Sequence, residues 1–265
     1  MKVLLINSVC GYGSTGKICT DIAEMLIKEG HECCIAFGRG HIPSGLIVPT
    51  YKICTAFNVG LDGIKSRLFD NSGFNSAVCT KRFIKWIDSY KPDLIHIHNL
   101  HGYYINIEIL LNYLRTKNIK VIFSLYDCWL FTGHCAHFEA SGCYQVNVGC
   151  RKCLYRNSYP KSLISKSRKN FLKKQQLLAE MPNAYFIYPS KWMAKTASKS
   201  FLSSYSFSIL PNGIDLSKFL INGEVPRIAK NKKKILLGIS SVWTESKGLS
   251  YFNRLADIIS SDYII

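Results

Sequence analysis

The chain has 265 residues, of which 48% are hydrophobic and 19% charged, so it can form a core and wholesale disorder is excluded. Its formal net charge of +17 suggests an anionic partner, such as nucleic acid, a membrane surface or a phosphorylated ligand; a solvated basic surface is the alternative. No apolar run approaches the roughly 20 residues of a membrane span. The length allows one large domain or two smaller ones.

The N-terminus does not resemble a signal peptide, because its short apolar run ends at glycines and a helix with acidic residues follows. Eleven cysteines in a chain without an export signal are typical of reduced thiols in the cytoplasm. Their odd number also argues against a complete disulfide framework. We therefore expect a cytoplasmic protein with free cysteines.

A strand–helix–strand unit is predicted at the start of the chain. Residues 2–9 are an apolar run typical of a buried strand, and residues 33–37 form a second one. Between them, apolar residues recur with the spacing of a helix face packed on a sheet, at Ile18, Ile22, Met25 and Leu26. Two strands joined through a helix in this way run parallel.

The same alternation continues along most of the chain. Strands are predicted at residues 94–98, 120–125, 184–188 and 207–210, and helices at residues 76–90, 107–115, 162–180 and 191–200. The segment 127–160 has no clear period and is rich in Cys, Gly, His and Tyr. A loop this long inside a compact domain is usually functional or cross-linked.

A second unit begins after a break at Pro211, Asn212 and Gly213. A strand at residues 235–239 and a helix at 250–259 are too short to make an independent α/β domain, so they either complete the first sheet or begin another domain. The prediction is an α/β protein with a parallel sheet. Its expected parts are a Rossmann-like domain at 1–215 with a cysteine-rich insertion at 127–160, a linker at 216–233 and the beginning of a second Rossmann-like domain at 234–265.

The segment from Gly11 to Lys17 joins the first strand to the first helix and fits two nucleotide-binding patterns. Its glycines match the dinucleotide pattern G-x-G-x-x-G and most of the phosphate-binding loop G-x-x-x-x-G-K. The phosphate-binding loop needs a hydroxyl residue after the lysine to hold Mg²⁺, but Ile18 occupies this position. The dinucleotide pattern needs an acidic residue after the second strand, where Arg39 would suit a 2′-phosphate instead. In either case, N–H groups at a helix N-terminus can meet an anion.

Polar residues follow several of the predicted strands. Ligands of open parallel sheets bind at the carboxyl ends of the strands, so these residues should converge on one edge. A single histidine at such a position can equally be structural. The residues are His98, Asn99, His101, Tyr126, Asp127 and Ser190, with Lys247 in the corresponding loop of the second unit.

The cysteine-rich segment contains a candidate structural zinc site. Cys150-x-x-Cys153 has the spacing of a zinc knuckle, and zinc takes four such ligands. The alternative is a set of small buried residues, because the other cysteine spacing is not a standard half-site. The candidate ligands are Cys135, Cys143, Cys150 and Cys153, accompanied by His134 and His137.

The predicted helix 162–180 is basic and amphipathic, with cations at Lys166, Arg168, Lys169, Lys173 and Lys174. Such a helix can lie on an anionic membrane, and a domain helix with a solvated charged face is the alternative. No zinc-finger, helix-turn-helix or RNA-binding signature supports a nucleic-acid partner.

A series of short motifs, in this order, resembles the N-terminal part of family-4 glycosyltransferases, which are retaining enzymes with the GT-B fold. The motifs are Gly13-Ser14-Thr15-Gly16-Lys17, Glu29-Gly30-His31-Glu32, Lys91-Pro92-Asp93-Leu94-Ile95-His96-Ile97-His98-Asn99, Pro189-Ser190-Lys191-Trp192, Leu210-Pro211-Asn212-Gly213-Ile214-Asp215 and Glu245-Ser246-Lys247-Gly248. The segment that begins Thr132-Gly133-His134-Cys135 resembles a subgroup associated with bacterial surface polysaccharides. The resemblance covers nearly the whole chain.

The resemblance implies two Rossmann-like domains, one binding a glycan or polyprenyl-linked acceptor and the other a UDP- or GDP-sugar. Transfer would retain the anomeric configuration without a catalytic metal, because fixed positive groups and helix N-termini stabilise the departing diphosphate. The enzyme would work in the cytoplasm, at the inner face of the membrane. The implied catalytic positions are His98, Tyr126 and Asp127, and the implied substrate and diphosphate positions are Gly13, Ser14, Thr15, Gly16, Lys17, Asn99, Ser190 and Lys247.

The chain also departs from the family pattern. Val242 replaces an arginine usually found five residues before Lys247, and Tyr126 replaces a histidine that touches the donor sugar. The family's Glu-x7-Glu motif would lie after Ile265. We therefore expect weak or no sugar transfer from residues 1–265 alone. The alternative functions are an NADP- or nucleotide-binding Rossmann protein and a non-catalytic basic membrane-surface module.

Overall fold

The computed structural model describes residues 1–138, 142–145, 148–157, 159–179, 181–216, 234–240 and 242–264. The chain divides into two compact units, Met1–Gly213 and Ile214–Ile265. The predicted linker at 216–233 lies, apart from its first residue, outside the described residues, as do Glu180 and Ile265. The assignment of domains therefore stays a prediction.

The first unit is built on a parallel sheet with the strand order β3-β2-β1-β4-β5-β6-β7. All neighbouring strands run parallel. This confirms the predicted α/β fold, in which central strands are apolar on both faces. The strands are β1 (Lys2–Asn7), β2 (Glu32–Phe37), β3 (Thr50–Lys52), β4 (Leu94–Ile97), β5 (Lys120–Ser124), β6 (Ala184–Tyr188) and β7 (Phe207–Ile209).

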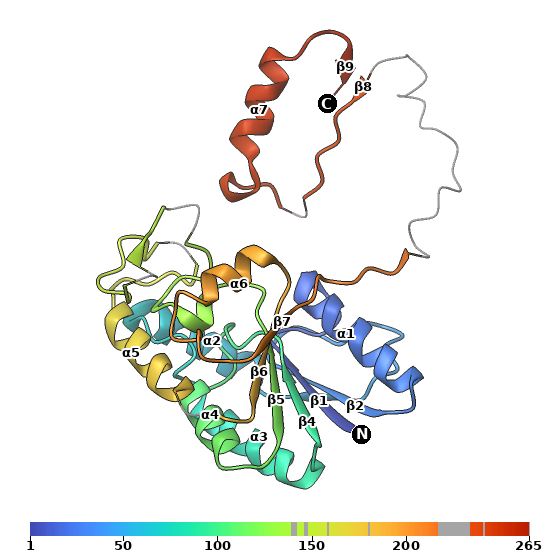
Figure 1. Ribbon diagram of the computed structural model, residues 1–265, viewed down its shortest axis with the longest axis vertical. Helices are drawn as coiled ribbons and strands as arrows, with labels where there is room; N and C mark the ends of the chain where they lie inside the picture. Colours follow the sequence, from blue (N-terminus) through green and yellow to red (C-terminus); the bar gives the residue numbers. More distant parts are fainter. Residues whose placement is uncertain are drawn as a thin grey trace. The chain divides into compact units, whose positions relative to one another are not determined.

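Helices cover both faces of this sheet (Figure 1). On one face, Val3 and Leu5 of β1 pack in a cluster with Cys19 and Ala23 of α1. On the other face, the alternate residues of β1 join a larger cluster with apolar side chains of α3, α4, α5 and α6. The helices are α1 (Gly13–Lys28), α2 (Ala56–Phe69), α3 (Ala77–Tyr90), α4 (Ile107–Arg115), α5 (Ser167–Leu178) and α6 (Lys191–Ala197), with a short 3-10 helix η1 (Trp129–Phe131).

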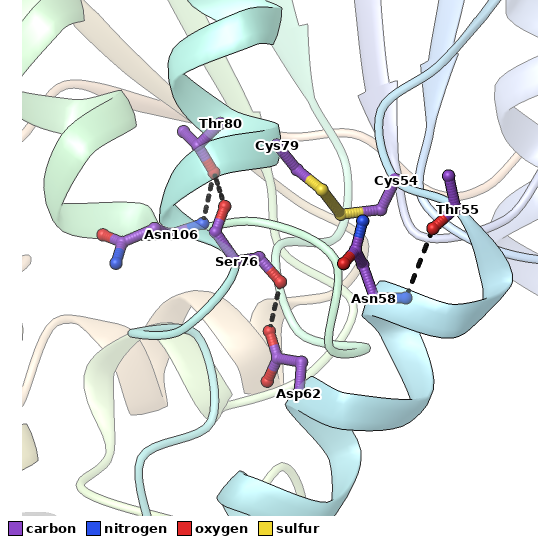
Figure 2. Close-up of a disulfide and its surroundings, with 8 residues drawn as sticks. All are labelled: Cys54, Thr55, Asn58, Asp62, Ser76, Cys79, Thr80 and Asn106. Carbon is purple, nitrogen blue, oxygen red and sulfur yellow. Dashed lines mark hydrogen bonds between the residues drawn. A yellow bond between two sulfur atoms is a disulfide. The ribbon is translucent and has the colours of Figure 1, made fainter.

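The region between β2 and α3 was not predicted and holds β3 and α2. It also corrects the expectation that all cysteines are free. Cys54 and Cys79 form a disulfide whose Cα atoms are 5.5 Å apart. Figure 2 shows that it joins the residue before the α2 cap to the first turn of α3. The number of cysteines in the sequence could not reveal that the fold brings these two residues together.

The second unit is a small strand–helix–strand arrangement. Strands β8 (Lys234–Ile235) and β9 (Tyr263–Ile264) pair in parallel. Between them lie a 3-10 helix, η6 (Glu245–Lys247), and the helix α7 (Leu249–Ile258). The predicted strand at 235–239 is therefore shorter than expected. Among the described residues of the chain, no helix is long and apolar enough to cross a membrane.

Candidate functional site

A group of polar side chains meets at the carboxyl edge of the first sheet. His101, in the loop after β4, contacts Asp127 after β5, with 2.7 Å between Nε2 and Oδ2. The other ring nitrogen of His101, Nδ1, lies 3.0 Å from the hydroxyl of Tyr159, which comes from the cysteine-rich segment. Arg39, after β2, lies beside Tyr159 and opposes the rise in its pKa. We call Arg39, His101, Asp127 and Tyr159 the edge network.

Asp127 is the fixed negative charge of the edge network. Its Oδ1 accepts the backbone N–H of Trp129 at 2.8 Å, and its other oxygen faces His101. Burial alone would raise the pKa of Asp127, but His101, this N–H group and the more distant His137 together lower it. The carboxylate is therefore ionised at neutral pH. It can accept a hydrogen bond from a sugar hydroxyl or orient a histidine.

Of the other two predicted catalytic residues, His98 is buried and Tyr126 is half-buried, like Asp127. His98 is 3% exposed, and its Nδ1 lies 2.9 Å from the Tyr126 hydroxyl. Burial, assisted by His96, lowers the pKa of His98 well below its usual value, so the ring is neutral. Burial raises the pKa of Tyr126 to about 12. The buried His98 Nε2 has no hydrogen-bond partner among the described residues.

These residues share a cavity of about 20 Å³, which is lined among others by His98, His101, Tyr126 and Asp127. This space suits a water molecule, and a sugar ring is too large for it. A ligand larger than water would therefore have to bind over the edge network from outside. The buried His98 would then support this edge from beneath, rather than touch the ligand.

The glycine loop ends in the first turn of α1, which begins at Gly13. Gly11 and Gly13 have φ of +72° and +63°, which favours glycine at both positions. The residue before the helix, Tyr12, provides no side-chain cap; its hydroxyl donates to the carbonyl of Arg39 instead, at 3.2 Å. The exposed Lys17 forms an ion pair with Asp21 one turn further on. The first N–H groups of α1 thus lack a side-chain acceptor from Tyr12 and can receive an anion.

The other predicted binding residues have visible structural roles. The Asn99 side chain accepts the backbone N–H of His101 at 3.0 Å and so shapes the loop of the edge network. Ser190 is the N-cap of α6, where it accepts the N–H of Met193 at 3.2 Å. Lys247 is exposed at the end of η6 in the second unit.

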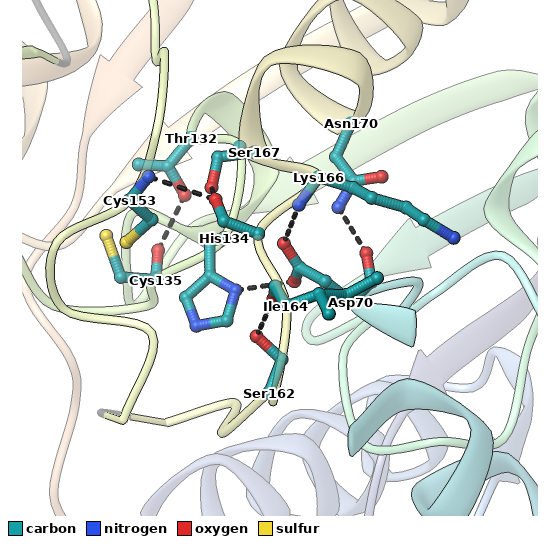
Figure 3. A network of polar contacts seen from close by, with 12 residues as sticks. Asp70, Thr132, His134, Cys135, Cys153, Ser162, Ile164, Lys166, Ser167 and Asn170 are labelled. Atoms are coloured by element: carbon teal, nitrogen blue, oxygen red, sulfur yellow. Dashed lines mark hydrogen bonds and ion pairs between the residues drawn. The ribbon is translucent and has the colours of Figure 1, made fainter. Parts of the chain in front are cut away.

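The cysteine-rich segment is anchored to the first unit by Asp70 (Figure 3). The buried Asp70 carboxylate lies 2.6 Å from Nδ1 of His134 and accepts the backbone N–H of Lys166, also at 2.6 Å. Its backbone carbonyl accepts the side-chain amide of Asn170 at 2.6 Å. One residue at the end of α2 therefore holds the cysteine-rich segment and the beginning of α5.

One of the cations named on the predicted basic helix, Lys174 of α5, is buried and belongs to no charged surface. The side chain is 1% exposed, and its Nζ donates to the carbonyls of Trp129 and Thr132 at 2.6 and 3.1 Å. The same Nζ lies 3.5 Å from the centre of a Trp129 ring. Burial lowers the pKa of Lys174 to about 7, although the charges of nearby acidic groups act to raise it. Lys174 thus fixes η1, directly beside Asp127.

The four predicted zinc ligands lie close enough for their charges to interact. Burial is the main cause that raises the pKa of Cys135 to about 12, and smaller contributions come from the thiols of Cys153, Cys150 and Cys143. All four are free thiols. In the part of the chain that the structure describes, however, no three His, Cys, Asp or Glu side chains are arranged as a metal site. The zinc site stays a prediction.

Sequence reasoning placed His101 at the sheet edge without a role, considered Arg39 only as a contact to a 2′-phosphate, and missed Tyr159. The parallel topology was the signal that could have placed Arg39 and His101 in one site, because it brings the loops after β2 and β4 to the same edge of the sheet. Added at Gly102, a Cβ atom would lie 3.5 Å from Nε of Arg39. Nothing local in the sequence marks Tyr159.

The fold of this chain is similar to that of a solved structure. Sucrose-phosphate synthase from Thermosynechococcus elongatus has a TM-score of 0.52 at 10% identity, over 88% of this chain and 54% of that one. An E. coli trehalose-6-phosphate protein bound with UDP-2-fluoro glucose has a TM-score of 0.45 at 10% identity, over 89% of this chain and 56% of that one. MurG of Acinetobacter baumannii has a TM-score of 0.29 at 11% identity, over 82% of this chain and 68% of that one. The chain spans about half the length of the first two structures.

No curated protein sequence matches the chain. The sequence profile described as Glycosyltransferase Family 4 matches residues 15–218, which is most of the chain. The matched range contains the whole edge network and the first turns of α1 from Thr15 onward. The dinucleotide and triphosphate interpretations of the glycine loop are therefore not favoured. The resemblance seen in the sequence motifs is confirmed, and the chain belongs to glycosyltransferase family 4.

Proposed function

We propose that this chain is the acceptor-side part of a retaining glycosyltransferase. It would act with a UDP- or GDP-sugar and a glycan or polyprenyl-linked acceptor in the synthesis of a surface polysaccharide. The observation that carries the proposal is the edge network, in which an ionised carboxylate orients a histidine at the carboxyl edge of a parallel sheet. In this fold class, ligands bind at that edge.

In this proposal, two features of the first unit have separate binding roles. The edge network would bind acceptor hydroxyls, with Asp127 accepting hydrogen bonds and Arg39 donating them. The N–H groups at the beginning of α1 would face phosphate oxygens, whose charge they and the helix dipole stabilise. Fixed dipoles and cations of this kind stabilise a departing diphosphate without a metal. In the second unit, Lys247 would be a separate candidate for contact with a diphosphate, as the family resemblance implies.

We further propose that the 265 residues alone transfer sugar weakly or not at all. In this proposal, the residues that hold the sugar and ribose belong to a second domain, to which residues 234–265 would contribute. The reaction would take place in the cytoplasm at the inner face of the membrane, where soluble sugar nucleotides and lipid-linked acceptors meet.

Acceptor binding by the 265-residue chain tests the edge network. Calorimetry with short glycans and soluble polyprenyl-phosphate analogues should find an acceptor whose affinity falls about 10- to 100-fold in Asp127→Asn, the effect of losing a hydrogen bond to a charged group. The matched control is Asp88→Asn, which alters an exposed carboxylate bonded to Tyr113 and Lys117. Equal acceptor affinity in Asp127→Asn and wild type would contradict the assignment.

Two further measurements test the rest of the proposal. Robust turnover of any sugar nucleotide by the 265-residue chain would contradict the expected weak activity. Tight calorimetric binding of NADPH or ATP would instead revive the dinucleotide or triphosphate interpretation of the glycine loop. Weak binding of both, together with acceptor binding, is the expected result.

A further inference from the structure

Arg39 is the cation of the edge network that has no carboxylate partner among the described residues. The carboxylate of the network, Asp127, directs its two oxygens to His101 and to the backbone N–H of Trp129. The side chain of Arg39 is half-buried and lies beside the hydroxyl of Tyr159. A guanidinium that has lost part of its water is stabilised most by an anion that accepts two of its N–H groups. Arg39 is therefore positioned to bind an anionic ligand.

The backbone of Arg39 is held on both sides. Its N–H donates to the carbonyl of Ser8 at 2.9 Å, and its own carbonyl accepts the hydroxyl of Tyr12 at 3.2 Å. The next carbonyl, of Gly40, accepts Nζ of the exposed Lys52 at 3.0 Å, which brings a second cation to the same loop. The loop after β2 is thus fixed before a ligand binds, and a fixed site loses less entropy on binding.

Two tyrosines form an aromatic corner beside this guanidinium. The ring centres of Tyr103 and Tyr159 are 6.4 Å apart, with an angle of 69° between the ring planes. Burial raises the pKa of both hydroxyls, and the charge of Arg39 opposes this rise in each case, so the guanidinium lies near both. Tyr159 is 39% exposed and Tyr103 is half-buried. An exposed tyrosine ring offers a face on which the C–H groups of a sugar ring can pack.

The backbone at Tyr103 supports a binding role for this corner. Its φ is +66°, an unusual conformation for a residue with a bulky side chain. The preceding Gly102 has a φ of +122°, and a Cβ atom added there would lie 3.1 Å from Cβ of Ser8 and 3.5 Å from Nε of Arg39. The loop after β4 therefore approaches the loop after β2 so closely that glycine is favoured. Conformations such as that of Tyr103 are concentrated at binding sites, where the surrounding fold imposes them.

We propose that Arg39, Tyr103 and Tyr159 form a subsite for a sugar of the acceptor that carries a carboxylate, as a uronic acid does. The carboxylate would accept two N–H groups of Arg39, and the sugar ring would pack against Tyr159. A doubly charged phosphate is less favoured, because a single guanidinium with the Asp127 carboxylate nearby balances its charge poorly. The inference rests on the proposed function and adds the chemical class of the acceptor.

Asp127 and Arg39 have different tasks in this subsite. His101 lies between them, because its Nε2 contacts Asp127 and its Nδ1 lies 3.0 Å from the hydroxyl of Tyr159. Asp127 would bind a hydroxyl, which neutral and acidic sugars share, whereas Arg39 would bind the carboxylate, which only the acidic sugar has. The preference for an acidic over a neutral sugar should therefore depend on Arg39.

Calorimetry with matched oligosaccharides tests the subsite on the 265-residue chain. Each neutral oligosaccharide of a panel is paired with the same compound after oxidation of its terminal C6 hydroxyl to a carboxylate, so the linkages and the sugar ring are unchanged. We expect a member of the panel to bind about 10- to 100-fold more tightly in its oxidised form, because a charge-assisted hydrogen bond is added. High salt should reduce this preference. In Arg39→Gln, the two forms should bind equally.

Matched controls change similar residues elsewhere in the first unit. Arg82→Gln removes an exposed arginine of α3, and Tyr185→Leu removes an exposed tyrosine of β6. Both should keep the full preference for the oxidised form. In contrast, Tyr159→Leu should weaken the binding of both forms, because the packing face is lost. Thermal melts should verify that all variants fold.

The inference is overturned if the neutral and oxidised forms bind wild type equally, or if Arg39→Gln keeps the preference. In either case, binding of a neutral form that is lost in Asp127→Asn would still support the proposed function. Absence of binding by every form in the panel would overturn both. A C6-phosphorylated form that binds more tightly than the oxidised form would overturn the carboxylate class.

Discussion

Replacing Asp70 by Ala should destabilise the first unit strongly, because this residue joins three separate segments. Its carboxylate is 2% exposed and serves both His134 and the backbone N–H of Lys166 (Figure 3). The substitution would leave both groups without their acceptor inside the protein. A hydrogen bond to a charged group contributes about 1.5–3 kcal/mol, so the two together contribute about 3–6 kcal/mol. Removing one partner of a buried charged pair costs about 3–5 kcal/mol, and we expect a loss in this range.

Denaturant titration and thermal melting measure this loss. For a unit of this size, each kcal/mol corresponds to about 2–4 °C, so the melting temperature should fall by roughly 6–20 °C. Asp70→Asn should fall between wild type and Asp70→Ala, because asparagine tolerates the positive φ of 49° and keeps one acceptor oxygen. Hydrogen exchange at the Lys166 amide should accelerate in both variants.

The control for this prediction is Asp21→Ala. It removes an exposed carboxylate that forms an ion pair with Lys17 four residues earlier on α1. Such pairs contribute about 0.2–0.5 kcal/mol. If Asp70→Ala lies within about 1 kcal/mol of wild type, the network does not hold these segments together, and the reasoning is wrong.

The remaining predictions concern titration and metal. The pKa of Lys174 is lowered by burial to about 7, so its stabilising effect is complete only above the unfolded pKa near 10.4 and is lost as pH falls toward 7. When the pH is lowered from 9 to 7 with a chelator present, the free energy of unfolding of wild type should therefore fall by about 2 kcal/mol more than that of Lys174→Met. The exposed control Lys169→Met should follow wild type. Parallel curves of unfolding free energy against pH for Lys174→Met and wild type would refute this. Metal analysis of protein purified without chelator should find stoichiometric zinc that is absent from Cys150→Ser and retained in Cys33→Ala; metal-free wild type would leave the cysteines as ordinary buried thiols.

The sequence was sufficient for every strand of the sheet except β3, because buried parallel strands are continuous apolar runs. Strand β6 and helix α4 have the predicted bounds. Parallel topology also explains why residues at strand ends, such as Asp127, could be assigned to one edge before any coordinates. Helix α2 was missed for the opposite reason. It buries Asp62 and exposes Phe57, so the usual pattern of a helix packed on a sheet is reversed.

The rest of the candidate site depends on contacts between distant residues. Tyr159 reaches His101 from an irregular segment with no period to interpret, and the two are 58 residues apart. Lys174 belongs to a run of cations on α5, and periodicity cannot tell which cation is buried. Its burial depends on two carbonyl groups and a Trp129 ring that arrive from η1. Such partners become visible only when the chain is folded.

The disulfide between Cys54 and Cys79 encloses the whole of α2 in one covalent ring. A peptide bond cut anywhere inside this ring leaves the two fragments joined until a reducing agent is added. Trypsin cleavage after Lys65 or Arg67 would therefore be invisible on a non-reducing gel and would separate the fragments on a reducing one. Since both residues lie on the exposed side of α2, the difference between the two gels would report whether that helix is shielded.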